Sequence, residues 1–345
     1  MQNFKEIVIY YFSGTGNSQN VAKWFTETAI KNNTVCTAHN IAKIDRKNIS
    51  KPPENALVVF ISPVHGFNYP PVMLNFSFRF PKAKNRVLLM NTRAGMLLGN
   101  FNLPGLTGIA FLLSSLVLIL KGYFINGFIP VDLPSNWMSL HPTLGSRAIE
   151  ILHQKNKKKV IDKTQKIISG KKDFRALREI IQDILISPIS LLYFLIGRFV
   201  LSKSFFASKD CNNCDICINK CPVKAIIKVD NRPYWTFKCE SCMRCMSNCP
   251  QRAINTAHGF FVGYLFLASF VSGLFFKYFD KLFFKISNIL LYNVIQIVLY
   301  LALIFVLYLL VHLLMRFKFF ERIMVFTSFT KYKFWGKRYK ALKNY

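Results

Sequence analysis

Eight of the nine cysteines of this chain form two copies of one closely spaced pattern. In each copy, three cysteines are spaced three residues apart and a fourth lies four residues after the third. A proline directly follows the fourth cysteine. The first copy is Cys211, Cys214, Cys217, Cys221 and Pro222, and the second is Cys239, Cys242, Cys245, Cys249 and Pro250. Ala225-Ile226 and Ala253-Ile254 also recur 28 residues apart, so the unit is predicted to be a duplication.

Two other uses of cysteine fit this spacing poorly. Zinc sites use paired Cys-x-x-Cys knuckles separated by a longer gap, although thiolate ligands alone do not decide between metals. A disulfide framework needs an oxidising compartment, and Met1 to Phe12 is a short strand-like run rather than a secretory signal. The cysteines are therefore expected on the reducing, cytoplasmic side. Cys36, alone in sequence, is expected to be a small buried hydrophobe.

The repeated run resembles the cysteine signature of bacterial ferredoxins. That resemblance implies two [4Fe–4S] clusters, in which three close thiolates hold one cluster and the fourth cysteine ligates the other. It assigns Cys211, Cys214, Cys217 and Cys249 to one cluster, and Cys239, Cys242, Cys245 and Cys221 to the second. An electron could then enter at one cluster and leave at the other.

The N-terminal half begins with a strand pattern followed by a glycine-rich turn. Ile7 to Phe12 is β-branched and aromatic, and a helical stretch runs from Gln19 to about Lys31. A turn in this position presents backbone N–H groups at the positive end of the helix dipole, where a phosphate can bind without a lysine. The turn lacks the Walker A and dinucleotide patterns. It resembles the phosphate loop of flavodoxins, and its residues are Ser13, Gly14, Thr15, Gly16, Asn17 and Ser18.

Further strands are predicted at 57–61, 86–90 and 123–132. In a doubly wound, flavodoxin-like parallel sheet of order 2-1-3-4-5, the ligand lies outside the carboxyl ends of the strands at the β1/β3 switch point. The loops after two of these strands are therefore candidates for binding FMN, and His65 and Asn91 are exposed-loop candidates for the isoalloxazine rim. The candidate loop residues are Pro63, Val64, His65, Gly66, Asn91, Thr92, Arg93, Ala94 and Gly95. The alternative is a flavodoxin-like fold that holds no flavin.

Several apolar stretches follow. The run 109–120 is too short to span a bilayer and is expected to be a helix packed on the sheet. A Lys-rich helix is expected from Arg147 to about Ile180, and 184–206 is expected to be an interfacial or bridging helix. The segments 259–276 and 286–315 are uncharged and long enough for a membrane hairpin.

Charge sets the expected orientation of that hairpin. The segment 316–345 holds nine Lys and Arg residues, so the positive-inside rule places the tail and the N-terminal domains in the cytoplasm. The chain is thus expected to be a multi-pass protein of the cytoplasmic membrane with both termini cytoplasmic. His258 and His312 would both lie at the cytoplasmic interface. They could bind a haem or a quinone there, or they could be ordinary polar residues of the interface.

A net charge of +30 in a chain that is 52% hydrophobic suits contact with anionic membrane lipid. Nucleic acid is not expected as a partner, because the basic residues are not interleaved with a recognisable nucleic-acid module. Basic surface would instead steer an acidic redox protein, such as a ferredoxin-like carrier or a reductase.

Taken together, Ser13–Ser18, Ser62–Phe67 and both cysteine motifs resemble a prokaryotic family in which a flavodoxin-like domain is fused to a bacterial-type two-cluster ferredoxin. The resemblance covers about residues 1–257 and implies electron transfer with FMN and two [4Fe–4S] clusters. The expected domains are a flavodoxin-like domain (1–170), a helical apolar bridge (171–207), an α+β ferredoxin domain (208–257), a transmembrane hairpin (258–318) and a basic cytoplasmic tail (319–345). Two alternatives stay open: a flavin-dependent reductase of a lipid-soluble quinone or lipid, and a non-catalytic membrane docking module without flavin.

Overall fold

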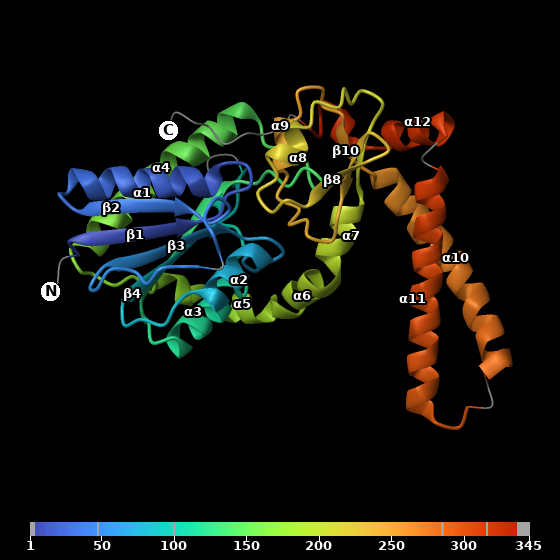
Figure 1. Ribbon diagram of the computed structural model, residues 1–345, viewed down its shortest axis with the longest axis horizontal. Coiled ribbons are helices and arrows are strands. Elements are labelled where there is room, and N and C mark those ends of the chain that lie inside the picture. Colours follow the sequence, from blue (N-terminus) through green and yellow to red (C-terminus); the bar gives the residue numbers. More distant parts are fainter. Residues whose placement is uncertain (1–3, 47, 99–100, 284–285, 315–316, 337–345) are drawn as a thin grey trace.

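The computed structural model describes residues 4–336 except 47, 99–100, 284–285 and 315–316. Three parts follow one another along the longest axis of the molecule (Figure 1). A layered α/β domain lies at one end, a small cysteine-containing domain lies in the middle, and two long helices form a hairpin at the other end.

The first domain is built on five parallel strands: β1 (Glu6–Tyr11), β2 (Val35–Asn40), β3 (Leu57–Pro63), β4 (Arg86–Leu98) and β6 (Phe124–Pro134). Their order across the sheet is β2-β1-β3-β4-β6, because β6 pairs with the free side of β4. The predicted 2-1-3-4-5 order is therefore confirmed.

Two hydrophobic cores lie on opposite faces of this sheet, because successive strand residues point to opposite sides. Ile7 and Ile9 of β1 pack in the core beneath α1 (Asn17–Lys31) and α4 (Ser146–Ile168). Val8 and Tyr10 pack in the core beneath α2 (Pro71–Arg79) and α3 (Ala110–Leu120). The run expected to be a sheet-packing helix at 109–120 is thus α3, whereas the helix expected to reach about Ile180 ends at Ile168.

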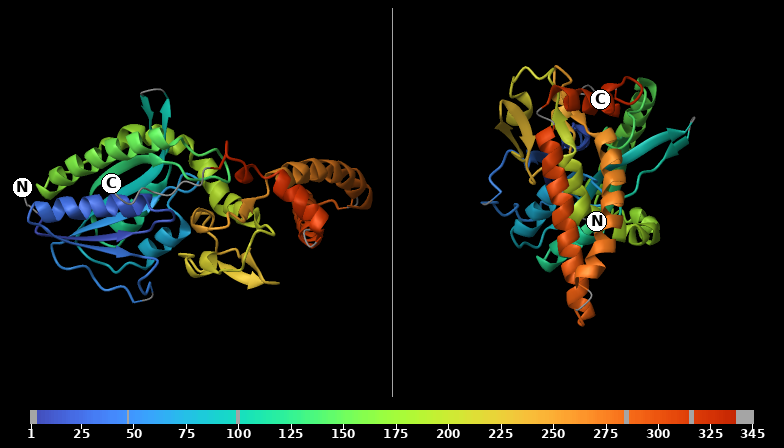
Figure 2. Two further views of the ribbon diagram at one scale, coloured as in Figure 1. Left: turned by 90° about the horizontal axis from the view of Figure 1, so that it is seen from above. Right: turned by 90° about the vertical axis from the view of Figure 1, so that its right-hand side faces the viewer.

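The predicted loop Asn91–Gly95 is wrong, because these residues continue β4. Their backbone pairs in register with Pro130–Pro134 of β6, so the strand has a partner well beyond Met90. β4 then turns back on itself, with Met96 opposite Leu103 of the short antiparallel strand β5 (Phe101–Leu103). This extension protrudes from the domain (Figure 2).

A chain of short helices connects the two domains: a 3₁₀ turn (Arg175–Glu179), α5 (Ile180–Leu185), α6 (Ser187–Leu192), a π-helical turn (Tyr193–Gly197) and α7 (Arg198–Lys203). These helices form two apolar arms, Arg175–Leu185 and Ser187–Lys203, that meet at a bend of 70°. The cysteine domain then contains β7 (Phe205–Ala207), α8 (Ile216–Asn219), β8 (Ile226–Val229), β9 (Arg232–Trp235), α9 (Arg244–Asn248) and β10 (Ile254–Thr256). Its two small sheets are β7 with β10 and β8 with β9.

The hairpin consists of α10 (His258–Phe283) and α11 (Ile289–Leu314). Each contains a stretch long and apolar enough to cross a membrane, His258–Phe279 and Ile289–Leu307. The chain then returns to the cysteine domain as α12 (Lys318–Phe326) and a 3₁₀ turn (Phe329–Lys331). The described part of the segment expected as a basic tail is therefore folded against the body.

The fold places one histidine in the core, and this makes stability depend on pH. His153 of α4 is fully buried with its ring edge-to-face against Trp24, and burial lowers its pKa to about 4. Between about pH 6.5 and 4 the unfolded chain binds a proton that the folded chain does not. Lowering the pH from 7.5 to 5.5 should therefore reduce the free energy of unfolding by about 1 kcal/mol through this group.

Urea unfolding of the wild type and His153→Phe at the two pH values measures that contribution. The variant should lose less stability on acidification, by the same ~1 kcal/mol. His39→Phe is the control, because His39 lies exposed on β2. An acid response unchanged in His153→Phe would contradict the assignment.

Candidate functional site

The eight repeated cysteines fall into two quartets, each around its own small cavity of about 20 Å³. Cys211, Cys214, Cys217 and Cys249 line one cavity. Cys221, Cys239, Cys242 and Cys245 line the other. Each quartet thus combines three cysteines of one copy with the fourth cysteine of the other copy, which is the grouping that the ferredoxin resemblance implies.

The backbone around the cysteines repeats as the sequence does. Three pairs of residues 28 positions apart share left-handed backbone conformations, an uncommon choice for residues other than glycine. The pairs are Asn213 with Ser241 (φ 56° and 49°), Asp215 with Met243 (53° and 58°), and Lys224 with Arg252 (both 51°). The Ala225 and Ala253 N–H groups also donate to Cys221 Sγ and Cys249 Sγ, at 3.2 and 3.3 Å. These turns fold the chain around each quartet and direct N–H groups at sulfur, a device that tunes cluster potentials.

The glycine-rich turn lies at the N-terminus of α1, as predicted. Gly16 takes a left-handed conformation (φ 119°), which favours glycine, and its N–H donates to Ser13 Oγ at 3.1 Å. Ser18 Oγ and Thr92 Oγ1 are hydrogen-bonded at 2.9 Å, and Asn17 Nδ2 donates to the carbonyl of Pro134 at 2.9 Å. These bonds fix the turn against the ends of β4 and β6.

A cavity of about 230 Å³ opens beside this turn. Of the fifteen predicted cofactor residues, all but Gly16, Asn91 and Gly95 line it. Sequence reasoning did not select the rest of the wall as cofactor-binding residues, except that it assigned Cys242 to a cluster. The additional lining residues are Phe67, Leu106, Leu133, Pro134, Ser135, Asn136, Trp137, His141, Ser241 and Cys242.

The two residues predicted for the isoalloxazine rim, His65 and Asn91, lie in different positions. His65 lines the cavity with its ring stacked on Trp137, at 6.0 Å between centroids, and its Nδ1 is buried with no protein partner among the described residues. Burial lowers the pKa of His65 to about 4, so the ring is neutral at pH 7. Asn91 is not an exposed loop residue, because it lies fully buried within β4 and donates to Thr107 Oγ1 at 3.3 Å.

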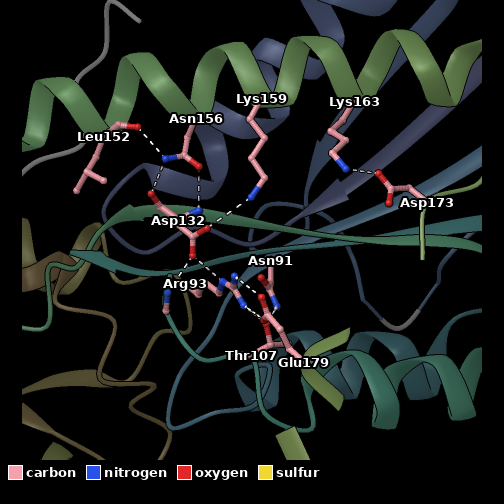
Figure 3. A network of polar contacts seen from close by, with 11 residues as sticks. Asn91, Arg93, Thr107, Asp132, Leu152, Asn156, Lys159, Lys163, Asp173 and Glu179 are labelled. Carbon is pink, nitrogen blue, oxygen red and sulfur yellow. Dashed lines mark hydrogen bonds and ion pairs between the residues drawn. The ribbon is translucent and has the colours of Figure 1, made fainter. Parts of the chain in front are cut away.

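Arg93 also lines the cavity, but its guanidinium is held by the buried Asp132 and the half-buried Glu179 (Figure 3). Its Nε donates to Asp132 Oδ1 at 2.6 Å, and its two terminal nitrogens donate to the carboxylate of Glu179. Asn156 of α4 joins the network by donating to the Asp132 carbonyl. Arg93 therefore connects β4, β6 and the bridge, and its charge is already neutralised within the protein.

The cavity beside the turn and the second quartet share a wall, because Cys242 lines both. A Cβ on Gly14 would lie 2.6 Å from the Cys242 carbonyl oxygen, so the cysteine loop packs directly on the glycine-rich turn. Arg244 donates to the carbonyls of Ser13 and Gly14 at 3.2 and 3.3 Å. Trp137 Nε1 donates to the Ser241 carbonyl at 3.1 Å, on the other side of the cavity.

A comparison with protein families identifies the cysteine domain. Residues 210–254 match the family model described as the 4Fe-4S dicluster domain. This part of the chain is therefore an iron–sulfur domain of the ferredoxin type. No curated protein sequence matches the chain.

Solved structures similar to the chain match just under half of it at low identity. Flavodoxin 1 from Bacillus cereus is 12% identical over 46% of this chain and 97% of its own, with a TM-score of 0.30. The general stress protein 14 in complex with FMN from Treponema denticola is 11% identical over 48% and 98%, with a TM-score of 0.29. Rubredoxin oxygen:oxidoreductase from Desulfovibrio gigas is 11% identical over 48% of this chain, which spans only 37% of that protein, with a TM-score of 0.28.

The thiols of the quartets are suited to binding a cationic metal centre. All eight thiols are free of disulfides, and burial raises the pKa of Cys242 and Cys245 to about 12. Thiolates in such surroundings need positive charge close by, which bound iron provides. Among the described residues, no group of three or more His, Cys, Asp or Glu side chains is placed to hold a single metal ion.

Of the two histidines near the hairpin, the structure describes the side chain of His258. Both ring nitrogens of His258 are hydrogen-bonded to the backbone, Nε2 to the Ser139 carbonyl at 2.9 Å and Nδ1 to the Phe329 N–H at 3.1 Å. His258 thus ties α10 to the segment after α12, and haem ligation would break these bonds. The side chain of His312 lies outside the described residues.

Proposed function

We propose that this protein is a membrane-anchored electron-transfer protein that passes electrons between FMN and two [4Fe–4S] clusters. The observation that carries the proposal is the position of Cys242, which lines both the cavity beside the glycine-rich turn and the cavity of the second quartet. A flavin in the first cavity would then lie next to a cluster in the second. Electron transfer between them would need no movement of the domains.

Two quartets provide the ligands for the proposed clusters. The one next to the flavin cavity is Cys221, Cys239, Cys242 and Cys245, and the outer one is Cys211, Cys214, Cys217 and Cys249. Each [4Fe–4S] cluster passes one electron at a time, whereas FMN accepts electrons singly or in pairs. The chain's own contribution is to hold sulfur at fixed positions and to direct the Ala225 and Ala253 N–H groups at it.

The proposed FMN would place its phosphate at the Ser13–Ser18 turn and the start of α1. Support comes from the helix dipole and from the guanidinium of Arg244, which sits beside the turn. The stacked pair of His65 and Trp137 would flank the ring system, and the buried His65 Nδ1 offers a hydrogen-bonding atom to it.

The outer quartet is the proposed point of exchange with a redox partner. Cys214 is exposed, whereas Cys242 of the inner quartet is half-buried and packs on Gly14 of the first domain. Lys209, Lys220 and Lys224 are exposed near the outer quartet in sequence, and such charges would steer an acidic ferredoxin-like carrier or reductase. The order flavin, inner cluster, outer cluster and partner is thus a continuous path, usable in either direction.

Membrane anchoring is supported by composition. α10 and α11 each have a span of sufficient length and hydropathy, and Leu185 of α5 and Leu192 of α6 expose apolar side chains on the bridge. Lys and Arg are abundant after α11. We therefore infer a multi-pass protein of the cytoplasmic membrane with both termini cytoplasmic.

The proposal is tested on protein purified anaerobically from membranes. We expect about eight iron and eight sulfide per chain together with one FMN, and an electron paramagnetic resonance signal of two interacting clusters after dithionite reduction. Iron and sulfide without flavin would favour a docking module over a relay. Zinc in place of iron, or recovery of the full chain in the soluble fraction, would refute the proposal.

Gly14 gives a direct test of the shared wall. Gly14→Ala should push the Cys242 loop away from the turn, because the new Cβ would lie 2.6 Å from a backbone oxygen. Overpacking of this kind costs about 1–3 kcal/mol, so FMN affinity should fall about tenfold or more while iron content stays unchanged. Gly145→Ala is the matched control, since a Cβ there meets nothing within 4 Å. Equal FMN affinity in both variants would argue against a flavin at this wall.

A further inference from the structure

A second cavity, of about 300 Å³, lies where the bridge, the cysteine domain and the hairpin meet. Phe199 and Lys203 of α7 form one wall, and Phe237 of the cysteine domain forms another. Phe261 and Tyr264 of α10 and Phe305 of α11 complete it. Both hairpin helices contribute residues from their candidate membrane spans, so a ligand dissolved in the lipid phase could enter here.

The lining is almost entirely apolar and aromatic, with one charged group. The Lys203 ammonium lies 4.4 Å from the centroid of the Phe237 ring, and Phe237 packs edge-to-face on Phe199. Aromatic walls of this kind suit a flat ring, and a single polar group in an apolar pocket fixes the orientation of its ligand.

Lys203 has a hydrogen-bond donor to spare. An ammonium group carries three N–H bonds. In the part of the chain that the structure describes, Lys203 donates to Tyr234 Oη at 2.9 Å and to the Trp235 carbonyl at 2.7 Å. The remaining N–H can donate to a carbonyl oxygen of a ligand in the cavity.

A single layer of residues separates this cavity from the cavity of the inner quartet. Trp235, whose carbonyl accepts from Lys203, also lines the cavity of Cys221, Cys239, Cys242 and Cys245. Phe205 lines the quartet cavity too, and its neighbour Ser204 lines the apolar cavity. A ligand bound here would therefore be within one aromatic side chain of the proposed inner cluster.

We infer that this cavity binds the ring of a lipid-soluble quinone, with a ring carbonyl accepting a hydrogen bond from Lys203. The inference rests on the proposed function, because a quinone bound at this position would exchange electrons with the proposed inner cluster. A phospholipid acyl chain could fill an apolar cavity, but it would need neither the flat aromatic walls nor the ammonium donor.

The experiment uses full-length protein in detergent, with its iron, sulfide and flavin content measured on the same preparation. A photoreactive azidoquinone is bound to the oxidised protein and the labelled peptides are mapped by mass spectrometry. We expect labels within 199–204, 257–264 or 301–305, and loss of labelling on adding excess decylubiquinone. Because binding is measured without electron flow, a preparation with full cofactor content that fails to label overturns this inference alone.

Two variants and a matched control make the assignment specific. Val200→Phe inserts a ring into the cavity and should reduce labelling about tenfold or more, whereas Val262→Phe, on α10 outside the lining, should leave it unchanged. Lys203→Met should weaken quinone binding about tenfold by removing a charged hydrogen bond. Labelling of Val200→Phe at the wild-type level, or displacement of the probe by phosphatidylglycerol but not by decylubiquinone, would overturn the inference.

Discussion

Replacing Cys249 with alanine is expected to abolish the outer cluster, built on Cys211, Cys214 and Cys217, although Cys249 stands in sequence beside the other triplet. The reason is that Cys249 shares a cavity with the first triplet. Iron and sulfide should fall from about eight to about four per chain, and the spin interaction between reduced clusters should vanish. Iron analysis and electron paramagnetic resonance of the reduced variant measure both effects.

Cys221→Ala is the reciprocal test, and it should remove the inner cluster instead. Because the inner quartet adjoins the flavin cavity through Cys242, this variant should also uncouple flavin reduction from the outer cluster. Cys36→Ala is the control, since Cys36 lies on β2 and bonds to Thr26 rather than to either quartet. If Cys249→Ala lost the inner cluster and kept the outer one, the crossed ligation would be wrong.

Arg93→Met should cost about 3–5 kcal/mol of the free energy of unfolding. Arg93 and Asp132 are both buried, and removing one partner of a buried ion pair leaves the other charge without compensation. Asp132 would keep Lys159, at 3.5 Å, and the Gly105 N–H, at 2.9 Å, whereas Glu179 on the bridge would lose Arg93. The side chain of methionine fills a space similar to that of arginine. The loss of stability would therefore come from the missing charge rather than from missing volume.

Arg175→Met is the matched control for this prediction, because Arg175 also pairs with an aspartate, at 2.9 Å, but is 56% exposed. The buried Asp173 would keep its ion pair with Lys163, and a pair with a largely exposed arginine is worth about 0–1 kcal/mol, so this variant should unfold close to the wild type. Urea unfolding followed by the fluorescence of buried Trp24 compares the two. Similar losses in both variants would show that the Arg93 network does not hold the domain together.

The sequence was most informative where chemistry restricts residue choice. The cysteine spacing predicted the grouping into two quartets, and the strand patterns located β1, β3, the first part of β4, and β6. The edge strand β2 was not predicted, because its side chains are mostly exposed and lack an apolar pattern. The extension of β4 was missed for a different reason: Asn91 to Gly95 are residues typical of loops, and only their pairing with β6 makes them a strand.

The wall between the cavity beside the glycine-rich turn and the inner quartet was also beyond sequence reasoning. Gly14 and Cys242 are far apart along the chain, and their contact depends on how two domains pack. No local pattern encodes that packing. The residues that fix it, Arg244 and Trp137, look in sequence like an ordinary surface cation and an ordinary loop aromatic.

The segment after the hairpin is fastened to the body at both ends. Ser328 Oγ donates to the Thr256 carbonyl at 2.7 Å just before α10 begins, and Trp335 Nε1 donates to the Met138 carbonyl of the first domain at 2.7 Å. In a bilayer the electron-carrying domains would then be unable to swivel about a flexible stalk. The outer quartet would then be held at a fixed distance and orientation above the membrane surface. Redox partners would reach it by lateral diffusion along that surface.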